Sequence, residues 1–335
     1  MNNGKETIIE LERIVKKYAS RASFFGARGK DIIALNMISI KILRGEIFGL
    51  VGESGSGKTT AGRLIARLEK PEQGRIYLKG LEMGVLKGKA LKNFPRKVQM
   101  IFQDPYQSLN PQLSIFDTIS EPLVIHKIGN AKDREDKVWQ IMKAVGLSPP
   151  DDFVNRYPHQ LSGGQRQRVA IARVMVLNPD FVVADEPTSM LDASISAQIF
   201  NILLEMREKF EVTLLFITHS LAAARYLCDR IAVIYKGNMM ELGSADQVIQ
   251  KPKHPYTQAL IDALPKFGRS AEPNQNNTLL SLEREAVEHT GCPFFTRCRV
   301  ANKTKCRLER PLLKETNDSH WVACFYATNG AKKGC

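Results

Sequence analysis

The stretch GESGSGKTT, residues 52–60, combines glycines with a lysine and a threonine at the spacing of a phosphate-binding loop. It follows an apolar run, IFGLV, and precedes TTAGRLIARLEK, whose spacing predicts a helix. Glycine lets backbone N–H groups turn toward phosphate oxygens, and a helix N-terminus adds positive potential. Lys58 would reach the β- and γ-phosphates of a nucleotide, and the Thr59 hydroxyl would coordinate Mg²⁺. A flexible Gly/Ser turn is the alternative, which the flanking strand and helix disfavour. The predicted nucleotide-binding set is Gly52, Glu53, Ser54, Gly55, Ser56, Gly57, Lys58, Thr59 and Thr60.

Two carboxylates end an apolar run further along the chain. FVVADEP, residues 181–187, predicts a short buried parallel strand that a proline terminates. A buried carboxylate at Asp185 is costly unless a cation or hydrogen bonds compensate its charge, and nucleotide-bound Mg²⁺ is such a cation. If the strand persists, the Glu186 side chain points to the opposite face from Asp185. A carboxylate there suits a general base that accepts a proton from an attacking water. An ordinary strand-end charge is the alternative for Glu186. The pair therefore predicts hydrolysis of a bound nucleotide.

A third motif, LSGGQRQRVAIAR at residues 161–173, places glycines at the start of a long predicted helix. Ser162 is a typical N-cap residue, and the two glycines after it expose backbone N–H groups. The motif thus predicts a second anion-binding helix end, far from Lys58 in the sequence. The residues predicted to contact nucleotide there are Ser162, Gly163, Gly164 and Gln165.

Taken together, the three motifs resemble the nucleotide-binding domain of ABC proteins. The resemblance covers roughly residues 8–265. It implies that the 161–173 motif of one subunit closes over ATP held by a partner, so that a dimer encloses two ATP molecules. It also implies that Gln103, in MIFQDP, senses the γ-phosphate and Mg²⁺ and couples to membrane subunits. The predicted Mg²⁺ residues are therefore Thr59, Gln103 and Asp185.

The resemblance assigns further residues around the nucleotide. His219, in LLFITHS, matches the histidine that contacts the γ-phosphate, and the predicted catalytic set is Glu186, His219, Lys58 and Gln103. Asp192 ends SMLD, which resembles the loop called the D-loop, although Met190 stands where alanine is more common. Tyr18 is our choice for the aromatic ring that stacks on adenine, with Phe24 and Phe25 close by in the sequence.

The order of elements predicts an α/β fold. Strand-like and helical segments alternate, which favours a parallel sheet covered on both faces. The resemblance specifies a P-loop, RecA-like nucleotide-binding domain with an antiparallel β subdomain and a helical subdomain. We expect residues 1–265 to form that domain, with the helical subdomain at about 105–170, and residues 266–335 to form a linker and a cysteine-rich C-terminal extension.

Two further stretches resemble the ATPases of oligopeptide/dipeptide ABC importers. They are FQDPYQSLNPQLSI after Gln103 and HPYTQAL at residues 254–260, and we assign the second no chemistry. The resemblance implies an ATPase that energises peptide import with a second ATPase subunit, identical or not, and two membrane permease subunits. A solute-binding protein outside the cell would take part indirectly. Importers of nickel or oligosaccharides in the same family are the alternative.

Composition limits other functions. The net charge of +13 is spread along the chain without a dense basic run, so it does not by itself indicate nucleic acid. A soluble, metal-sensing ATPase acting on nucleic acid remains the rival hypothesis, and the lack of coiled-coil heptads counts against it. No apolar run approaches the roughly 18 residues of a membrane span, and the first residues lack the apolar block of a signal peptide. We expect a protein at the cytoplasmic face of the membrane.

Four of the six cysteines, with spacing C-x5-C-x7-C-x17-C, cluster near the C-terminus. Disulfides are uncommon in the cytosol, and converging thiolates on a metal would staple a segment too short for its own core. Zinc sites usually carry C-x2-C pairs, which are missing, whereas a [4Fe–4S] cluster accepts irregular spacing. The segment resembles the extension of peptide-importer ATPases, where such a cluster is implied. We predict a structural or regulatory [4Fe–4S] cluster, with Zn²⁺ as the alternative, on Cys292, Cys298, Cys306 and Cys324.

Overall fold

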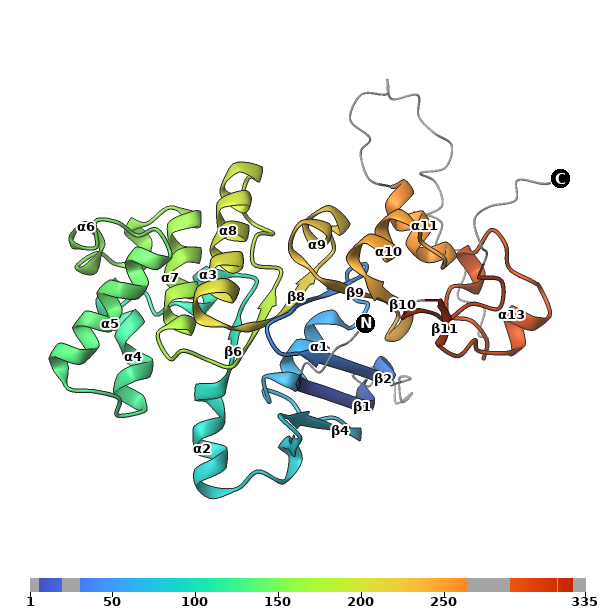
Figure 1. Ribbon diagram of the computed structural model, residues 1–335, viewed down its shortest axis with the longest axis horizontal. Coiled ribbons are helices and arrows are strands. Elements are labelled where there is room, and N and C mark those ends of the chain that lie inside the picture. Colours follow the sequence, from blue (N-terminus) through green and yellow to red (C-terminus); the bar gives the residue numbers. More distant parts are fainter. Residues whose placement is uncertain (1–5, 20–30, 264–289, 318, 328–335) are drawn as a thin grey trace, which may run out of the picture. The chain divides into compact units, whose positions relative to one another are not determined.

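The computed structural model describes residues 6–19, 31–263, 290–317 and 319–327 (Figure 1). These residues form two compact units. The first comprises residues 6–12, 39–47 and 61–217, and the second comprises residues 13–19, 31–38, 48–60, 218–263, 290–317 and 319–327. Phe24 and Phe25 lie outside the described residues, and so do residues 266–289 of the predicted linker and extension.

The first unit contains three parallel strands: β6 (Val98–Ile101), β7 (Phe181–Asp185) and β8 (Thr213–Thr218). Strand β7 lies between the other two, in the register Phe181 with Val98 and with Thr213. Every residue of β7 and β8 is buried, as the continuous apolar runs predict for strands covered on both faces. The parallel arrangement predicted for FVVADEP is confirmed.

The helices that follow β6 in the first unit pack on one another. Helices α4 (Ile115–Ile125) and α5 (Ala131–Ala144) both contact α7 (Gly163–Met175), as Figure 1 shows. Ser114 and Asn130 start α4 and α5 because their side chains accept the backbone N–H of the third helical residue. The other helices of this unit are α2 (Gly88–Lys97), α3 (Pro105–Ser108), α6 (Asp151–Val154), α8 (Ala193–Phe210) and the 3₁₀ turns η1 (Met83–Val85) and η2 (Pro158–Gln160).

A four-stranded sheet has the order β2-β1-β4-β5. Its strands are β1 (Thr7–Tyr18), β2 (Ile32–Leu43), β4 (Gln73–Leu78) and β5 (Leu81–Glu82). The sequences of β1, β2 and β4 are TIIELERIVKKY, IIALNMISIKIL and QGRIYL. A turn follows β2, with Gly45 at a φ of 72°.

The second unit contains a mixed sheet in the order β11-β12-β10-β9-β3. Strand β3 (Ile47–Val51) is parallel to β9 (Arg230–Tyr235), and the other pairs are antiparallel. The remaining strands are β10 (Asn238–Ser244), β11 (Lys314–Asn317) and β12 (His320–Val322). Because β12 pairs with β10, the cysteine-bearing region is part of this sheet.

The helices of the second unit are short. They are α9 (Leu221–Leu227), α10 (Ala245–Gln250), α11 (Pro255–Asp262), α13 (Lys305–Leu308) and the 3₁₀ turn η4 (Phe295–Arg297), and α1 (Lys58–Ile65) begins here. Cys228 is buried and directly follows α9. Within the described part of the chain, no helix combines the length and apolarity that crossing a membrane requires.

Candidate functional site

The loop between β3 and α1 has a shape that only glycine permits at two positions. A Cβ atom on Gly52 would collide with the carbonyl oxygen of Ile234, and one on Gly57 with that of Ala34. Gly57 also has a φ of 102°, which L side chains rarely adopt. The glycine spacing that predicts a phosphate loop therefore follows from close contacts with neighbouring backbone.

Lys58 lies inside the curve of this loop. Its side chain is buried, and Nζ donates to the carbonyl oxygens of Gly52 and Glu53, both at 2.8 Å. The loop is fixed from outside because Gly237 N–H donates to the Ser56 carbonyl at 2.9 Å. An ammonium group held inside a glycine-rich backbone loop is the arrangement that binds nucleotide phosphates.

Two further predicted residues belong to the same unit. The Tyr18 hydroxyl lies 3.4 Å from Oγ1 of Thr60, so the structure brings the predicted adenine-stacking residue to the phosphate loop. Its side chain is half-buried. His219 is exposed between β8 and α9, where Thr218 Oγ1 accepts the N–H of Ser220 at 2.9 Å.

In the first unit, Asp185 is the last residue of β7 and is buried, as predicted. The strand does not persist to the next residue, because Glu186 has a left-handed backbone with a φ of 44°. The extended strand that would place the Glu186 and Asp185 side chains on opposite faces therefore ends before Glu186. Instead its N–H donates to the Ile217 carbonyl at 2.9 Å, and its carboxylate accepts from Gln103 Nε2 at 3.4 Å. Gln103 and Glu186 are thus brought together.

The predicted N-cap at Ser162 is confirmed. Its hydroxyl accepts the N–H of Gln165 at 3.3 Å, and the Gln165 side chain accepts the N–H of Ser162 at 2.9 Å. This capping box leaves Gly163 and Gly164 as the first residues of α7. Asp192 caps α8 in a related way, and the hydrogen bond from Ile195 N–H lowers the pKa of its carboxyl group.

Comparison with known proteins shows the family to which the chain belongs. A family model described as "ABC transporter" matches residues 35–189, and one described as "Oligopeptide/dipeptide transporter, C-terminal region" matches residues 240–306. The oligopeptide transport ATP-binding protein AppF of Bacillus subtilis (strain 168) is 42% identical over 323 residues, 96% of this chain and 97% of AppF. The chain belongs to the ATP-binding subunits of the oligopeptide/dipeptide ABC transporter family. ATPase activity is expected of this family.

Other relatives and solved structures agree. The dipeptide transport ATP-binding protein DppF of Haemophilus influenzae is 38% identical to this subunit, with 97% of the subunit and 99% of DppF covered. A dimeric ATP-binding cassette, solved after hydrolysis with bound ADP and phosphate, is similar at 29% identity and a TM-score of 0.62. The match covers 71% of this subunit and 99% of that chain, which confirms the predicted nucleotide-binding fold.

The HPYTQAL marker of the ABC subunit has contacts that its sequence does not reveal. His254 Nδ1 accepts the N–H of Tyr256 at 3.0 Å and so caps α11. Burial lowers the pKa of His254 to about 4, despite the opposing effect of Glu241. The imidazole is therefore neutral at pH 7, as the cap requires. Tyr256 is fully buried, and its hydroxyl accepts the N–H of Glu53 in the phosphate loop at 3.1 Å.

The four C-terminal cysteines lie in the second unit and influence one another electrostatically. Three of the sulfur atoms accept a backbone N–H from the residue two positions on; the pairs are Cys292 with Phe294, Cys298 with Val300 and Cys324 with Tyr326. Burial raises the pKa of the Cys292 thiol to about 12 and that of Cys298 to about 11. Hydrogen bonds to sulfur are typical of metal–thiolate centres. Nevertheless, within the described ranges no three His, Cys, Asp or Glu side chains are arranged to hold a metal ion, so the predicted cluster is not confirmed.

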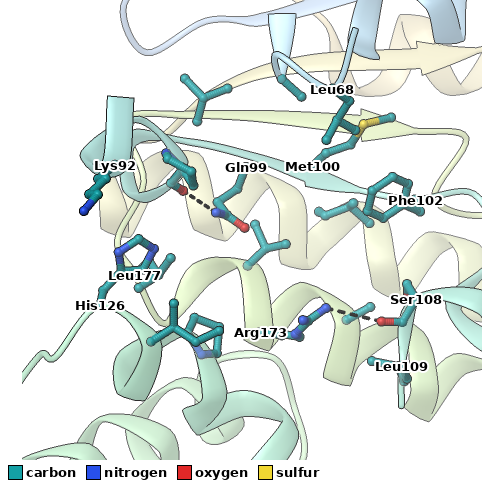
Figure 2. Close-up of a pocket in the computed structure, with 18 residues that line it drawn as sticks. Leu68, Lys92, Gln99, Met100, Phe102, Ser108, Leu109, His126, Arg173 and Leu177 are labelled. Atoms are coloured by element: carbon teal, nitrogen blue, oxygen red, sulfur yellow. Dashed lines mark hydrogen bonds between the residues drawn. The ribbon is translucent and has the colours of Figure 1, made fainter. Parts of the chain in front are cut away.

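A pocket of about 650 Å³ opens in the first unit (Figure 2). Its walls come from α2, β6, the end of α4 and α7, and include Phe102, which directly precedes Gln103. Arg173 spans the pocket wall, donating to the Ser108 carbonyl at 3.2 Å and pairing with Glu121 at 2.7 Å. The lining is otherwise largely apolar and includes Leu68, Met100, Leu109, Ile125 and Leu177.

Sequence reasoning missed one ion pair at the phosphate loop. Arg297 binds both carboxylate oxygens of Glu53, each at 2.9 Å. The sequence presents Glu53 only as one member of the loop motif, and Arg297 only as one of several basic residues around the cysteines. The two lie 244 positions apart, and no motif connects them.

Proposed function

We propose that this subunit hydrolyses ATP to energise peptide import through separate membrane subunits. The observation that carries the proposal is the phosphate loop, whose close backbone contacts exclude side chains and whose lysine is buried within it. The class of cargo comes from the relatives, which are named as oligopeptide and dipeptide transport ATP-binding proteins.

Each predicted residue has a role in this proposal. Lys58 would give up its two carbonyl partners to bind the β- and γ-phosphates, while the loop N–H groups bind the same oxygens. The Thr59 hydroxyl and, through water, Asp185 suit Mg²⁺, which binds oxygen ligands and neutralises developing charge on the phosphates. Glu186 would accept a proton from the attacking water, and Gln103 orients that carboxylate. His219 would contact the γ-phosphate, and Tyr18 would stack on the adenine ring.

Dimerisation follows from the same proposal. The N-terminus of α7, with Gly163 and Gly164 in its first turn, is a second site for phosphate oxygens. We propose that it serves the ATP held by a second ATP-binding subunit, and that Asp192 lies at the same subunit interface. Two membrane permeases complete the transporter at the cytoplasmic face of the membrane, and an external solute-binding protein delivers the peptide to them.

We propose that the apolar pocket lined by Phe102 receives a helix of a permease subunit. Its largely apolar lining suits the apolar face of a helix, and the chain runs directly from Phe102 in its wall to Gln103, which contacts Glu186. Docking there would therefore link the membrane subunits to the residue proposed as the base.

The function and the docking pocket can be tested together in vesicles containing the permeases and both ATPase subunits. We expect peptide-dependent uptake and ATP hydrolysis with the native chain. Ile125 lines the pocket, and Ile125→Glu should abolish uptake because a charge would be buried on docking. Val124 is exposed on the same helix but does not line the pocket, so Val124→Glu is the matched control. Uptake that survives Ile125→Glu contradicts the docking site, and no peptide-dependent hydrolysis with the native chain contradicts the function.

We further propose that the four cysteines hold a [4Fe–4S] cluster, with Zn²⁺ as the alternative. The support is the chemistry of the donor set: the four thiols influence one another electrostatically, and three of them accept backbone N–H groups as thiolate ligands do. The role of such a centre would be structural or regulatory, because phosphoryl transfer to water requires no electron transfer.

Metal content tests this proposal directly. Protein purified without oxygen should absorb broadly near 400 nm and contain about four iron and four sulfide ions per chain. Cys298→Ser should lower both contents, whereas Cys228→Ser should not, because Cys228 is a buried thiol outside the cluster. About one zinc ion per chain without colour would select the alternative. Neither metal would show that these thiols bind none.

A further inference from the structure

Glu53, in the phosphate loop, is held at three points. Its backbone N–H donates to the Tyr256 hydroxyl at 3.1 Å, and its carbonyl accepts from Lys58 Nζ at 2.8 Å. Its carboxylate accepts two hydrogen bonds from the guanidinium of Arg297, both at 2.9 Å. Lys58 belongs to the loop itself, whereas Tyr256 and Arg297 both lie in the region that matches the oligopeptide/dipeptide transporter C-terminal model.

The Arg297–Glu53 pair is built as a strong ion pair. The Arg297 side chain is only 13% exposed and that of Glu53 33%, so solvent screens the pair less than it does a surface pair. Both terminal nitrogens of the guanidinium are used in a fork that a lysine cannot reproduce. The guanidinium also lies 5.6 Å from the ring centre of Tyr235 and 5.7 Å from that of Phe294.

An aromatic cluster fixes the position of this arginine. The ring of Tyr235 lies 4.6 Å from that of Tyr256 and 5.5 Å from that of Phe294, centre to centre. Arg297 Nη1 also donates to the Tyr235 hydroxyl at 3.3 Å. The residues that hold Glu53 therefore pack on a shared aromatic cluster.

The negative charge of Glu53 makes the ion pair with Arg297 important for the binding of phosphates. A carboxylate on a loop that binds phosphates repels the ligand unless a cation neutralises it. We propose that Arg297, together with Tyr256, positions the phosphate loop and neutralises Glu53, so that the C-terminal region sets the affinity of the subunit for ATP. This inference rests on the proposed ATP site.

The inference also links the cysteine segment to ATP. Arg297 directly precedes Cys298, whose N–H donates to the Phe295 carbonyl at 3.3 Å. The turn before it is fixed because Phe295 N–H donates to the Cys292 carbonyl at 3.0 Å, and Cys292 N–H donates to the Cys306 carbonyl at 2.8 Å. The fold of the cysteine segment therefore determines where Arg297 lies. Unfolding of that segment would weaken ATP binding without any change in the sequence of the phosphate loop.

The test removes the Arg297 charge alone and then both charges together. Equilibrium ATP binding and the kcat and KM of hydrolysis are measured on the full-length subunit. Arg297→Met should weaken ATP binding about tenfold, the effect of one uncompensated charge near the phosphates, and should raise KM more than it lowers kcat. Adding Glu53→Gln should restore most of the affinity, because the repelling charge is then gone. Arg297→Lys should recover part of the loss, and higher ionic strength should shrink it.

Matched controls separate this role from simple stabilisation. Arg299→Met removes an exposed positive charge two positions away and should leave ATP affinity unchanged. If Arg297→Met lowers the melting temperature but Glu53→Gln does not restore affinity, the arginine only holds the tail in place, and the inference is wrong. Unchanged affinity in Arg297→Met also overturns it. Failure of the native chain to bind ATP would instead refute the proposed function, so the two failures are distinguishable.

Discussion

Glu186→Gln is expected to bind ATP normally and to hydrolyse it about 10²–10⁴-fold more slowly, the contribution typical of a general base. The amide has the same size as the carboxylate and can keep a hydrogen bond to Gln103, but it cannot accept a proton from water. The native Glu186 carboxylate lies 3.4 Å from Gln103 Nε2. The backbone of Glu186 has a φ of 44°, a strained conformation of a kind that is frequent at functional sites. Phosphate release and equilibrium ATP binding, measured on the same preparation, give the two quantities.

A surface substitution provides the control for this prediction. Glu205 is exposed on α8 and pairs with Lys209 at 2.7 Å, so Glu205→Gln makes the same chemical change away from Glu186 and should leave hydrolysis unchanged. Because the variant Glu186→Gln retains ATP, it should also accumulate as a dimer in the presence of ATP and Mg²⁺. Hydrolysis at the native rate in Glu186→Gln would show that another group takes the proton.

The local parts of the site could be predicted because short-range chemistry determines them. Gly57 must be glycine where backbone carbonyls approach, Ser162 must cap a helix, and Asp185 must end a buried strand. Each of these requirements leaves a mark within a few residues of sequence. The strands and helices that carry them could be predicted for the same reason, since apolar periodicity reports burial.

The contacts that the sequence did not reveal join distant segments. Arg297 and Glu53 form a pair 244 positions apart, and their residue types are common on any protein surface. Glu241 is fully buried, and its carboxylate accepts from the backbone N–H groups of Lys253 and His254 and contacts His320 Nε2 at 2.7 Å. A glutamate in a strand carries no sign of such burial, because the compensating donors come from elsewhere in the chain.

Backbone conformation explains the one local prediction that failed. The alternation of Asp185 and Glu186 assumed an extended strand, and the left-handed backbone at Glu186 breaks it. Nothing in ADEP requires a positive φ, since glutamate is not among the residues that favour it. The cysteines show a different limit. Their spacing identifies a set of ligands but not the metal, because thiolates serve both zinc and iron–sulfur centres.

Gly57→Ala is expected to destabilise the fold by at least about 2 kcal/mol and to abolish ATP binding. An alanine at a φ of 102° is strained, and its Cβ would also collide with the Ala34 carbonyl oxygen, which belongs to backbone and cannot swing aside. The loop must then move, and the N–H groups that would bind phosphates move with it. Chemical unfolding measures the first effect, and calorimetric titration with ATP measures the second.

Gly45 separates the two causes because it has a comparable conformation without the collision. Its φ is 72°, and no atom lies within 4 Å of the position that a Cβ would take. Gly45→Ala should therefore cost only the conformational strain, about 1 kcal/mol, and should bind ATP like the native chain. If Gly57→Ala matches Gly45→Ala in both stability and ATP affinity, the approach of the Ala34 carbonyl does not shape the loop, and glycine at position 57 serves its backbone conformation alone.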